Sequence, residues 1–170
     1  QQMEESAVEV ICPNGERKME PITITSKESP LIHMQDVAGD PVSLPENGAL
    51  MTRKLCETLG VEPGDTIRIK RTERYPLSVP ILQTAYFASG QGIYMTDAYW
   101  KSLGETFQPT ALLVKWNGAP DQRFLSSDAV ADAATRESQQ SGLSSSTQVV
   151  NLSVMMMIVM GASLAFVVLY

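Results

Sequence analysis

The chain has 170 residues, of which 44% are hydrophobic and 19% are charged. That composition supports a packed core and excludes a wholly disordered chain, a collagen and a small disulfide scaffold. The formal net charge is −6, which argues against a nucleic-acid-binding protein because phosphate binding needs clustered Lys and Arg. Nine acids and three bases fall in residues 1–50, and an ordinary solvated acidic face is the favoured explanation.

The N-terminal part of the sequence predicts a β-hairpin. Residues 7–11 (AVEVI) are typical of a strand, and Pro13-Asn14-Gly15 is a turn signal. Residues 21–26 alternate Ile with Thr, which predicts the second strand. Residues 27–48 are rich in Pro and Gly, so we expect a loop there, with a short strand near residues 31–34.

Two later segments share a pattern, ALMTRKLCETLG (49–60) and IYMTDAYWKSLG (93–104). Each predicts a strand, an N-cap, a two-turn helix and a glycine C-cap. Thr52 and Thr96 are the expected N-caps, and Gly60 and Gly104 suit the left-handed position after a helix. The two copies, 44 residues apart, are either an internal repeat or one common strand–helix punctuation used twice, and the second interpretation is favoured.

The rest of the sequence before the apolar run predicts three further strands, a helix and a polar linker. Strands are expected over residues 66–71, 77–87 and 110–116, a helix from Ser127 to about Ser138, and a polar linker over residues 141–148. The predicted fold class is therefore α+β, with mixed and antiparallel strands and short helices over residues 1–140.

The C-terminal segment is different in kind. From Leu152 to Tyr170 only Ser153, Gly161 and Ser163 interrupt an apolar run, and no charge follows Glu137. A helix of this length spans roughly 28 Å, close to the hydrocarbon thickness of a bilayer. We therefore expect a transmembrane helix over residues 149–170, at the end of a segment of a longer membrane protein. The alternatives are a buried central helix and an artefact of where the chain is cut.

Few residues are candidates for chemistry. His33 is the only histidine, so a His-based metal cluster is excluded and a surface position is expected. Cys12 and Cys56 are expected to be unpaired thiols, with a disulfide as the alternative and a zinc or nucleophile role least favoured. No G-x-S-x-G motif occurs. No catalytic, cofactor-binding or metal site is therefore predicted, and no cofactor.

Other side chains have ordinary explanations. The carboxylate pairs Glu4-Glu5 and Asp36/Asp40 lack an EF-hand loop and are expected on a solvated face. Trp100 and Trp116 are expected to pack rather than stack on a ligand. In the apolar run, the residues that invite a soft-metal or helix-packing role are Met155, Met156, Met157, Met160, Gly161 and Ala165. Lipid contact and ordinary packing are the favoured explanation for them.

The order of these segments resembles one family. The stretch ENGALMTRKLCETLGVEPGDTIRIK (46–70), with Leu59, Gly60, Gly64, Asp65 and Ile67, is similar to the extracytoplasmic domain of FtsX-like ABC transporter permeases, the group that includes the macrolide-exporter type. GIYMTDAYWKSLG (92–104) resembles a later strand–helix stretch of that family, and SLAFVVLY (163–170) resembles the start of its second membrane helix. The similarity runs over most of residues 40–170.

The resemblance implies a non-enzymatic permease subunit in the cell membrane, with residues 1–148 on the extracytoplasmic side. A cytoplasmic ABC ATPase would be a separate subunit, because the chain lacks a phosphate-binding loop. A second permease copy and an outside substrate or partner are expected, and the substrate is left open. The alternative is a single-pass membrane-anchored surface protein that binds a ligand or cell-wall component, and a membrane-tethered hydrolase is disfavoured.

Overall fold

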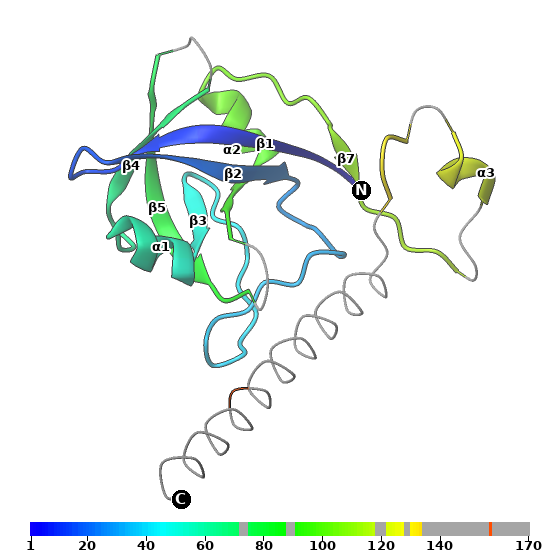
Figure 1. Ribbon diagram of the computed structural model, residues 1–170, viewed down its shortest axis with the longest axis horizontal. Helices are drawn as coiled ribbons and strands as arrows, with labels where there is room; N and C mark the ends of the chain where they lie inside the picture. Colours follow the sequence, from blue (N-terminus) through cyan, green and yellow to red (C-terminus); the bar gives the residue numbers. More distant parts are fainter. Residues whose placement is uncertain (72–74, 88–90, 118–121, 128–129, 134–156, 158–170) are drawn as a thin grey trace, which may run out of the picture. The chain divides into compact units, whose positions relative to one another are not determined.

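The computed structural model describes residues 1–71, 75–87, 91–117, 122–127, 130–133 and 157. The chain divides into two units, residues 1–115 and 116–170. The first unit contains a closed barrel of six strands, and one short strand, β7 (Ala111–Leu112), is added outside it (Figure 1). The barrel strands are β1 (Gln2–Ile11), β2 (Arg17–Thr25), β3 (Ala49–Thr52), β4 (Thr66–Lys70), β5 (Leu77–Ala85) and β6 (Ile93–Thr96).

The strands are ordered β2-β6-β3-β5-β4-β1, and pairing of β1 with β2 closes the ring. The β1–β2 and β4–β5 hairpins are antiparallel, as are the β1–β4 and β3–β6 contacts. The β2–β6 and β3–β5 contacts are parallel. Closure leaves none of these six strands as a free sheet edge along its whole length, which protects the barrel from edge-to-edge association.

The strand pairing has an internal two-fold symmetry. Exchanging β1, β2 and β3 with β4, β5 and β6 leaves every contact and its direction unchanged. A residue of β1 or β2 is equivalent to the residue 59 positions later, in β4 or β5, and a residue of β3 to the one 44 positions later, in β6. The equivalent residues Val10 and Ile69 are also paired with each other, as are Leu50 and Tyr94. A two-fold axis through these two antiparallel pairs requires this register. The structure therefore favours an internal repeat over two independent occurrences of a common strand–helix motif.

Each half carries one short helix after its third strand. Helix α1 (Arg53–Leu59) follows β3, and α2 (Asp97–Ser102) follows β6. The Thr96 hydroxyl accepts a hydrogen bond from the Tyr99 N–H, as predicted for an N-cap. Thr52 occupies the predicted N-cap position of α1, but the expected side-chain cap bond is absent, because its hydroxyl accepts the Gly92 N–H, 3.2 Å away, and so joins the two halves. Gly60 and Gly104 both have positive φ, as predicted.

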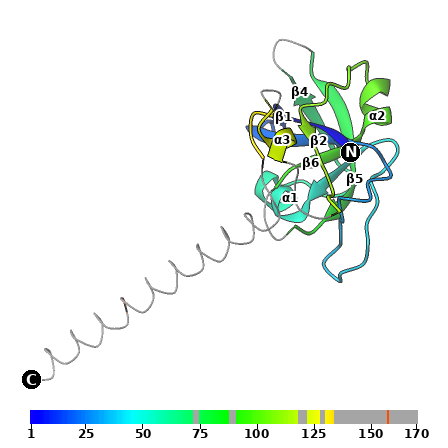
Figure 2. The ribbon, with the colours of Figure 1, turned by 90° about the vertical axis from the view of Figure 1, so that its right-hand side faces the viewer.

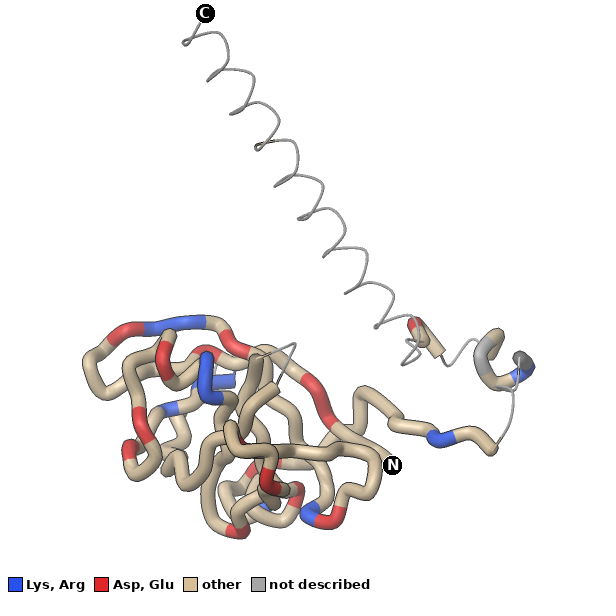
Figure 3. The backbone as a smooth tube through the Cα atoms, turned by 90° about the horizontal axis from the view of Figure 1, so that it is seen from below, with Lys and Arg blue, Asp and Glu red and all other residues tan. Residues whose placement is uncertain are grey.

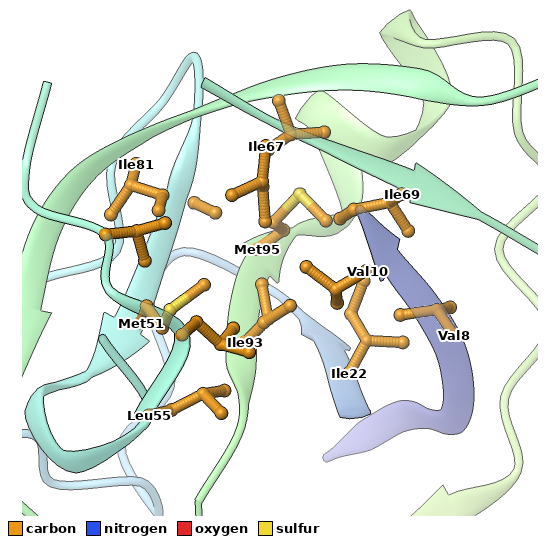
Figure 4. Packing of buried hydrophobic residues seen from close by; sticks show 14 of the residues in the cluster. Val8, Val10, Ile22, Met51, Leu55, Ile67, Ile69, Ile81, Ile93 and Met95 are labelled. Carbon is orange, nitrogen blue, oxygen red and sulfur yellow. The ribbon is translucent and has the colours of Figure 1, made fainter. Parts of the chain in front are cut away.

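The barrel interior is filled by aliphatic side chains from all six strands and from α1. Figure 4 shows them converging from opposite walls, with the thioether of Met95 near the middle and Met51 beside Leu55. The residues buried here include equivalent pairs from the two halves: Val8 and Ile67, Val10 and Ile69, Ile22 and Ile81, Met51 and Met95, and Cys56 and Trp100. Strand alternation places these on the inner face, and their burial is the main stabilising term.

The first and last parts of the barrel chain lie side by side. Strand β7 pairs with the start of β1, and the Gln1 amino group donates to the Leu113 carbonyl at 2.7 Å. The Leu113 N–H donates back to the Gln1 carbonyl at 2.8 Å. Figure 1 shows the N-terminus next to β7. The first residue of the barrel and the residues at which the chain leaves it therefore lie side by side.

The predicted α+β class is wrong, because residues 1–113 form a closed β-barrel whose only helices are α1 and α2 in the described part of that range. The predicted hairpin and the strands at β4 and β5 are confirmed. The strand expected over residues 31–34 is absent, and Gln35 instead makes two isolated bridges. The strand expected over residues 110–116 is reduced to β7.

The C-terminal unit differs from its prediction where it is described. Helix α3 (Gln122–Leu125) lies before the helix expected from Ser127, and residues 130–133 are not helical. Among the described residues, no helix has both the length and the apolar character needed to cross a membrane. The linker over 141–148 and, apart from Met157, the transmembrane helix expected over 149–170 lie outside the described residues.

Candidate functional site

The candidate functional site is the connection between β2 and β3, residues 26–48, together with the end of β5 that it contacts. It covers the outer face of β3, β5 and β6 with a small apolar cluster. The buried members are Met34 and Leu44 from the connection and Leu50 and Ala85 from the strands, and Ile32, Val42, Phe87 and Tyr94 pack against them. The Phe87 and Tyr94 rings stack with centroids 5.1 Å apart.

This connection explains why β3 and β6 carry apolar side chains on both of their faces. Met51 and Met95 face the barrel interior, whereas Leu50 and Tyr94 face the opposite side, where the connection buries them. Burial raises the pKa of the Tyr94 hydroxyl. The connection is therefore a packed part of the domain, even though its composition predicts a loop.

The tip of the connection is a hairpin-like turn, which we call the finger (residues 35–41). Its two sides are joined by the Asp36 N–H, which donates to the Asp40 carbonyl at 2.9 Å. The Asp36 carboxylate accepts the N–H groups of Ala38 and Asp40, at 2.8 and 2.9 Å. Gly39, with φ of +91°, supplies the left-handed residue of the turn.

A shallow pocket of about 320 Å³ lies on another side of the same connection. It is lined by Lys27, Glu46 and Asn47 and by residues at the start of β6–α2, namely Thr96, Asp97, Ala98, Tyr99 and Ser102. Its charges are already neutralised, since Lys27 pairs with Glu46 and Lys101 pairs with Asp97 at 2.8 Å. The Lys27 ammonium lowers the pKa of the Glu46 carboxyl. A ligand would find hydrogen-bonding groups here but no unpaired charge from the lining residues.

The structure separates the sequence-predicted candidates. His33 is exposed, and Cys12 and Cys56 are both buried and free. Burial raises the pKa of both thiols, that of Cys56 to about 11, so neither is activated as a nucleophile. Within the described part of the chain, no three His, Cys, Asp or Glu side chains come together as metal ligands.

Glu4 and the two tryptophans each make contacts that hold the structure together. The solvated position expected for Glu4 is wrong: Glu4 is fully buried, and its carboxylate pairs with the Arg71 guanidinium at 2.7 Å and accepts the Gln108 N–H at 2.6 Å. This ties the segment after α2 to β1. Trp100 is fully buried in the barrel core, as predicted for a packing residue. Trp116, in the second unit, packs edge-on against Phe124, with ring centroids 5.7 Å apart.

Most of the candidate residues of the apolar run lie outside the part of the chain that the structure describes. Met157 is described and is 74% exposed. The others, Met155, Met156, Met160, Gly161 and Ala165, lie outside the described residues. The sequence did not lead us to predict the finger. The sequence does contain a signal for a turn there, since Asp36 and Asp40 flank a glycine.

Comparison with known proteins assigns no family. No protein-family model matches the sequence, and no curated protein matches it.

Proposed function

We propose that this chain is part of an FtsX-like ABC transporter permease, with the barrel as its extracytoplasmic domain. Its role is to couple ATP-driven movement of membrane segments to substrate export or to an outside partner. The barrel lies outside the cell membrane, together with the rest of residues 1–148, and the apolar residues 149–170 attach it to the membrane. ATP hydrolysis belongs to a separate cytoplasmic ATPase, and the barrel is not an enzyme.

The observation that carries this proposal is the paired edge where the barrel begins and ends. Gln1 and Leu113 exchange two hydrogen bonds, so the residues at the two ends of the barrel sequence lie side by side. A domain held at one place can be carried on a membrane subunit without separating its flanking segments. Because the strands close into a ring around a packed core, a displacement at this edge moves the barrel as one body.

Two sequence features support the same proposal. The segments that resemble the permease family, 46–70 and 92–104, contain the equivalent strand–helix units β3–α1 and β6–α2. The uncharged residues 152–170 have a composition suited to a hydrocarbon environment. The partners are a cytoplasmic ABC ATPase, a second permease copy and an outside protein or substrate. The alternative, a single-pass anchored surface protein, needs neither of the first two.

The proposal is tested by removing the barrel from the intact membrane protein. Residues 1–113 are replaced by a short Gly/Ser connector, which the adjacency of Gln1 and Leu113 allows without stretching the flanking chain. We expect the associated ATPase to keep its basal rate and the substrate- or partner-dependent phenotype to be lost. A normal phenotype without the barrel would remove its coupling role. Turnover of a substrate by the full chain without its ATPase would overturn the non-enzymatic assignment.

A further inference from the structure

The two halves of the barrel differ most in one pair of equivalent connections. The connection from β2 to β3 spans residues 26–48, which is 23 residues, whereas the equivalent connection from β5 to β6 spans residues 86–92, which is 7 residues. Seven residues are enough to join a second strand to a third in this barrel. The additional length of the first connection is therefore not required for closing the barrel.

The longer connection is held in a defined shape. The Val42 N–H donates to the Met34 carbonyl at 2.9 Å, and the Tyr86 N–H, at the end of β5, donates to the Gln35 carbonyl at 2.7 Å. These bonds fix the base of the finger to the barrel, and Met34 is buried beneath it. With the Asp36 turn at its tip, the finger presents one preorganised surface, which lowers the entropy cost of binding.

The finger extends away from the strands. In two perpendicular views it is the sky-blue to cyan loop that reaches beyond the end of the barrel (Figures 1 and 2). Its apolar side chain at the tip, Val37, is 65% exposed, and Tyr86, whose backbone bridges to the base of the finger, is 58% exposed. A fixed turn with an exposed apolar side chain at its tip and an exposed Tyr at its base has the composition of a binding surface.

The finger is also acidic. Asp36 and Asp40 lie on either side of Val37, and within the described residues neither carboxylate has an ion-pair partner. Elsewhere the basic and acidic positions of the chain are interspersed (Figure 3), and many cations have acidic partners of their own. These paired cations are Arg17, Lys18, Lys27, Arg53, Arg71 and Lys101. The finger is thus a place where negative charge is left for another molecule.

We propose that the finger docks into an apolar pocket rimmed by Lys and Arg on a separate protein outside the membrane. Val37 would enter the pocket, and the two carboxylates would meet the basic rim. This inference deepens the proposed function, on which it rests, by naming the element of the domain that meets the outside partner. Two carboxylates beside the apolar tip disfavour insertion into an anionic lipid surface. Docking onto a second copy is the alternative that the crosslinking test distinguishes.

The test uses site-specific photocrosslinking of the full-length protein in its native membrane. Val37 is replaced by p-benzoyl-phenylalanine, and the crosslinked residues of the captured molecule are mapped by mass spectrometry. The same probe at Val114, which is 43% exposed, is the control for position. Asp40→Lys reverses a charge on the finger but keeps the backbone bonds of the turn. Glu62→Lys makes the same charge change at an exposed turn elsewhere and is the control for charge.

We expect the position-37 probe to crosslink a protein at a site with apolar and basic residues, and the position-114 probe not to do so. Asp40→Lys should lower the crosslink yield at least about tenfold, and Glu62→Lys should leave it unchanged. A crosslink to lipid or to a second copy, no crosslink, or equal effects of both charge reversals would overturn the proposal. Loss of the phenotype on removal of the barrel but not in Val37→Ser and Asp40→Lys would reject the finger while leaving the coupling function intact.

Discussion

Gly48 and Gly92 occupy equivalent positions at the start of β3 and β6, and the symmetry of the barrel makes them a matched pair. At Gly48 an added Cβ would lie 2.8 Å from the Pro80 carbonyl oxygen and 2.7 Å from the Leu82 Cγ. At Gly92 the nearest atom is the Pro21 carbonyl oxygen, at 3.2 Å. Pro80 and Pro21 are themselves equivalent, so one substitution probes the same parallel contact in both halves with different clearance.

Gly48→Ala should destabilise the barrel, because the close atom is backbone and β3 is held between β5 and β6. Overpacking costs about 1–3 kcal/mol, and replacing Gly by Ala returns about 0.4–1 kcal/mol through the unfolded chain. The net loss in the free energy of unfolding is then about 1–2 kcal/mol. Gly92→Ala needs a shift of only a few tenths of an ångström and should change the free energy by less than about 0.5 kcal/mol.

The assay is equilibrium urea unfolding of the full chain, followed by far-ultraviolet circular dichroism. Adding Leu82→Ala to Gly48→Ala should recover part of the loss, since Leu82 is 45% exposed and its side chain supplies two of the three close atoms. The Pro80 carbonyl remains, so recovery should be incomplete. If Gly48→Ala were as stable as Gly92→Ala, the parallel β3–β5 contact would not have the close approach described here.

Three other perturbations give sharp expectations. Arg71→Ala leaves the buried Glu4 carboxylate uncompensated in a pair whose Arg71 side is partly exposed, and should lower the free energy of unfolding by about 1–3 kcal/mol. That loss should exceed the loss in Glu4→Gln, and the reverse order in urea unfolding would contradict this pairing. Burial raises the pKa of Cys56 to about 11 from 9.0, so its thiolate fraction at pH 8 falls about 100-fold, which the greater nucleophilicity of a more basic thiolate offsets in part. Iodoacetamide should therefore label Cys56 at least about tenfold more slowly in the native chain than in urea, and equal rates would contradict its burial. Thr96→Ala should cost about 1 kcal/mol by removing the α2 cap, and a loss near zero in the same unfolding assay would mean that the cap contributes nothing.

Local sequence patterns were informative where neighbouring residues determine the structure. The β1–β2 hairpin follows from alternation around an Asn-Gly turn, and Gly60 ends α1 because a left-handed residue is needed there. The α+β prediction failed because ring closure depends on the parallel β2–β6 and β3–β5 contacts between distant segments. Strands of four residues, such as β3 and β6, carry little periodic signal of their own.

Tertiary contacts also explain the individual errors. Thr52 has the sequence of an N-cap, yet its hydroxyl serves a long-range bond to Gly92. The connection over residues 26–48 has the composition of a loop, but Met34 and Leu44 give it a packed base. The internal repeat becomes convincing only when Pro21-Ile22 and Pro80-Ile81 are recognised as equivalent, which requires two different offsets, 59 and 44 residues. A comparison at one offset finds only part of the repeat, because the connections between the second and third strands differ in length.

The central claim, that the barrel belongs to an ABC transporter permease, is tested most directly by purifying the full-length protein from its native membrane in mild detergent. The account predicts that an ABC ATPase copurifies in stoichiometric amount and that the complex hydrolyses ATP. A full-length protein that is extracted intact, with its barrel folded and without any ATPase or ATP hydrolysis, would contradict the claim and favour a single-pass anchored surface protein.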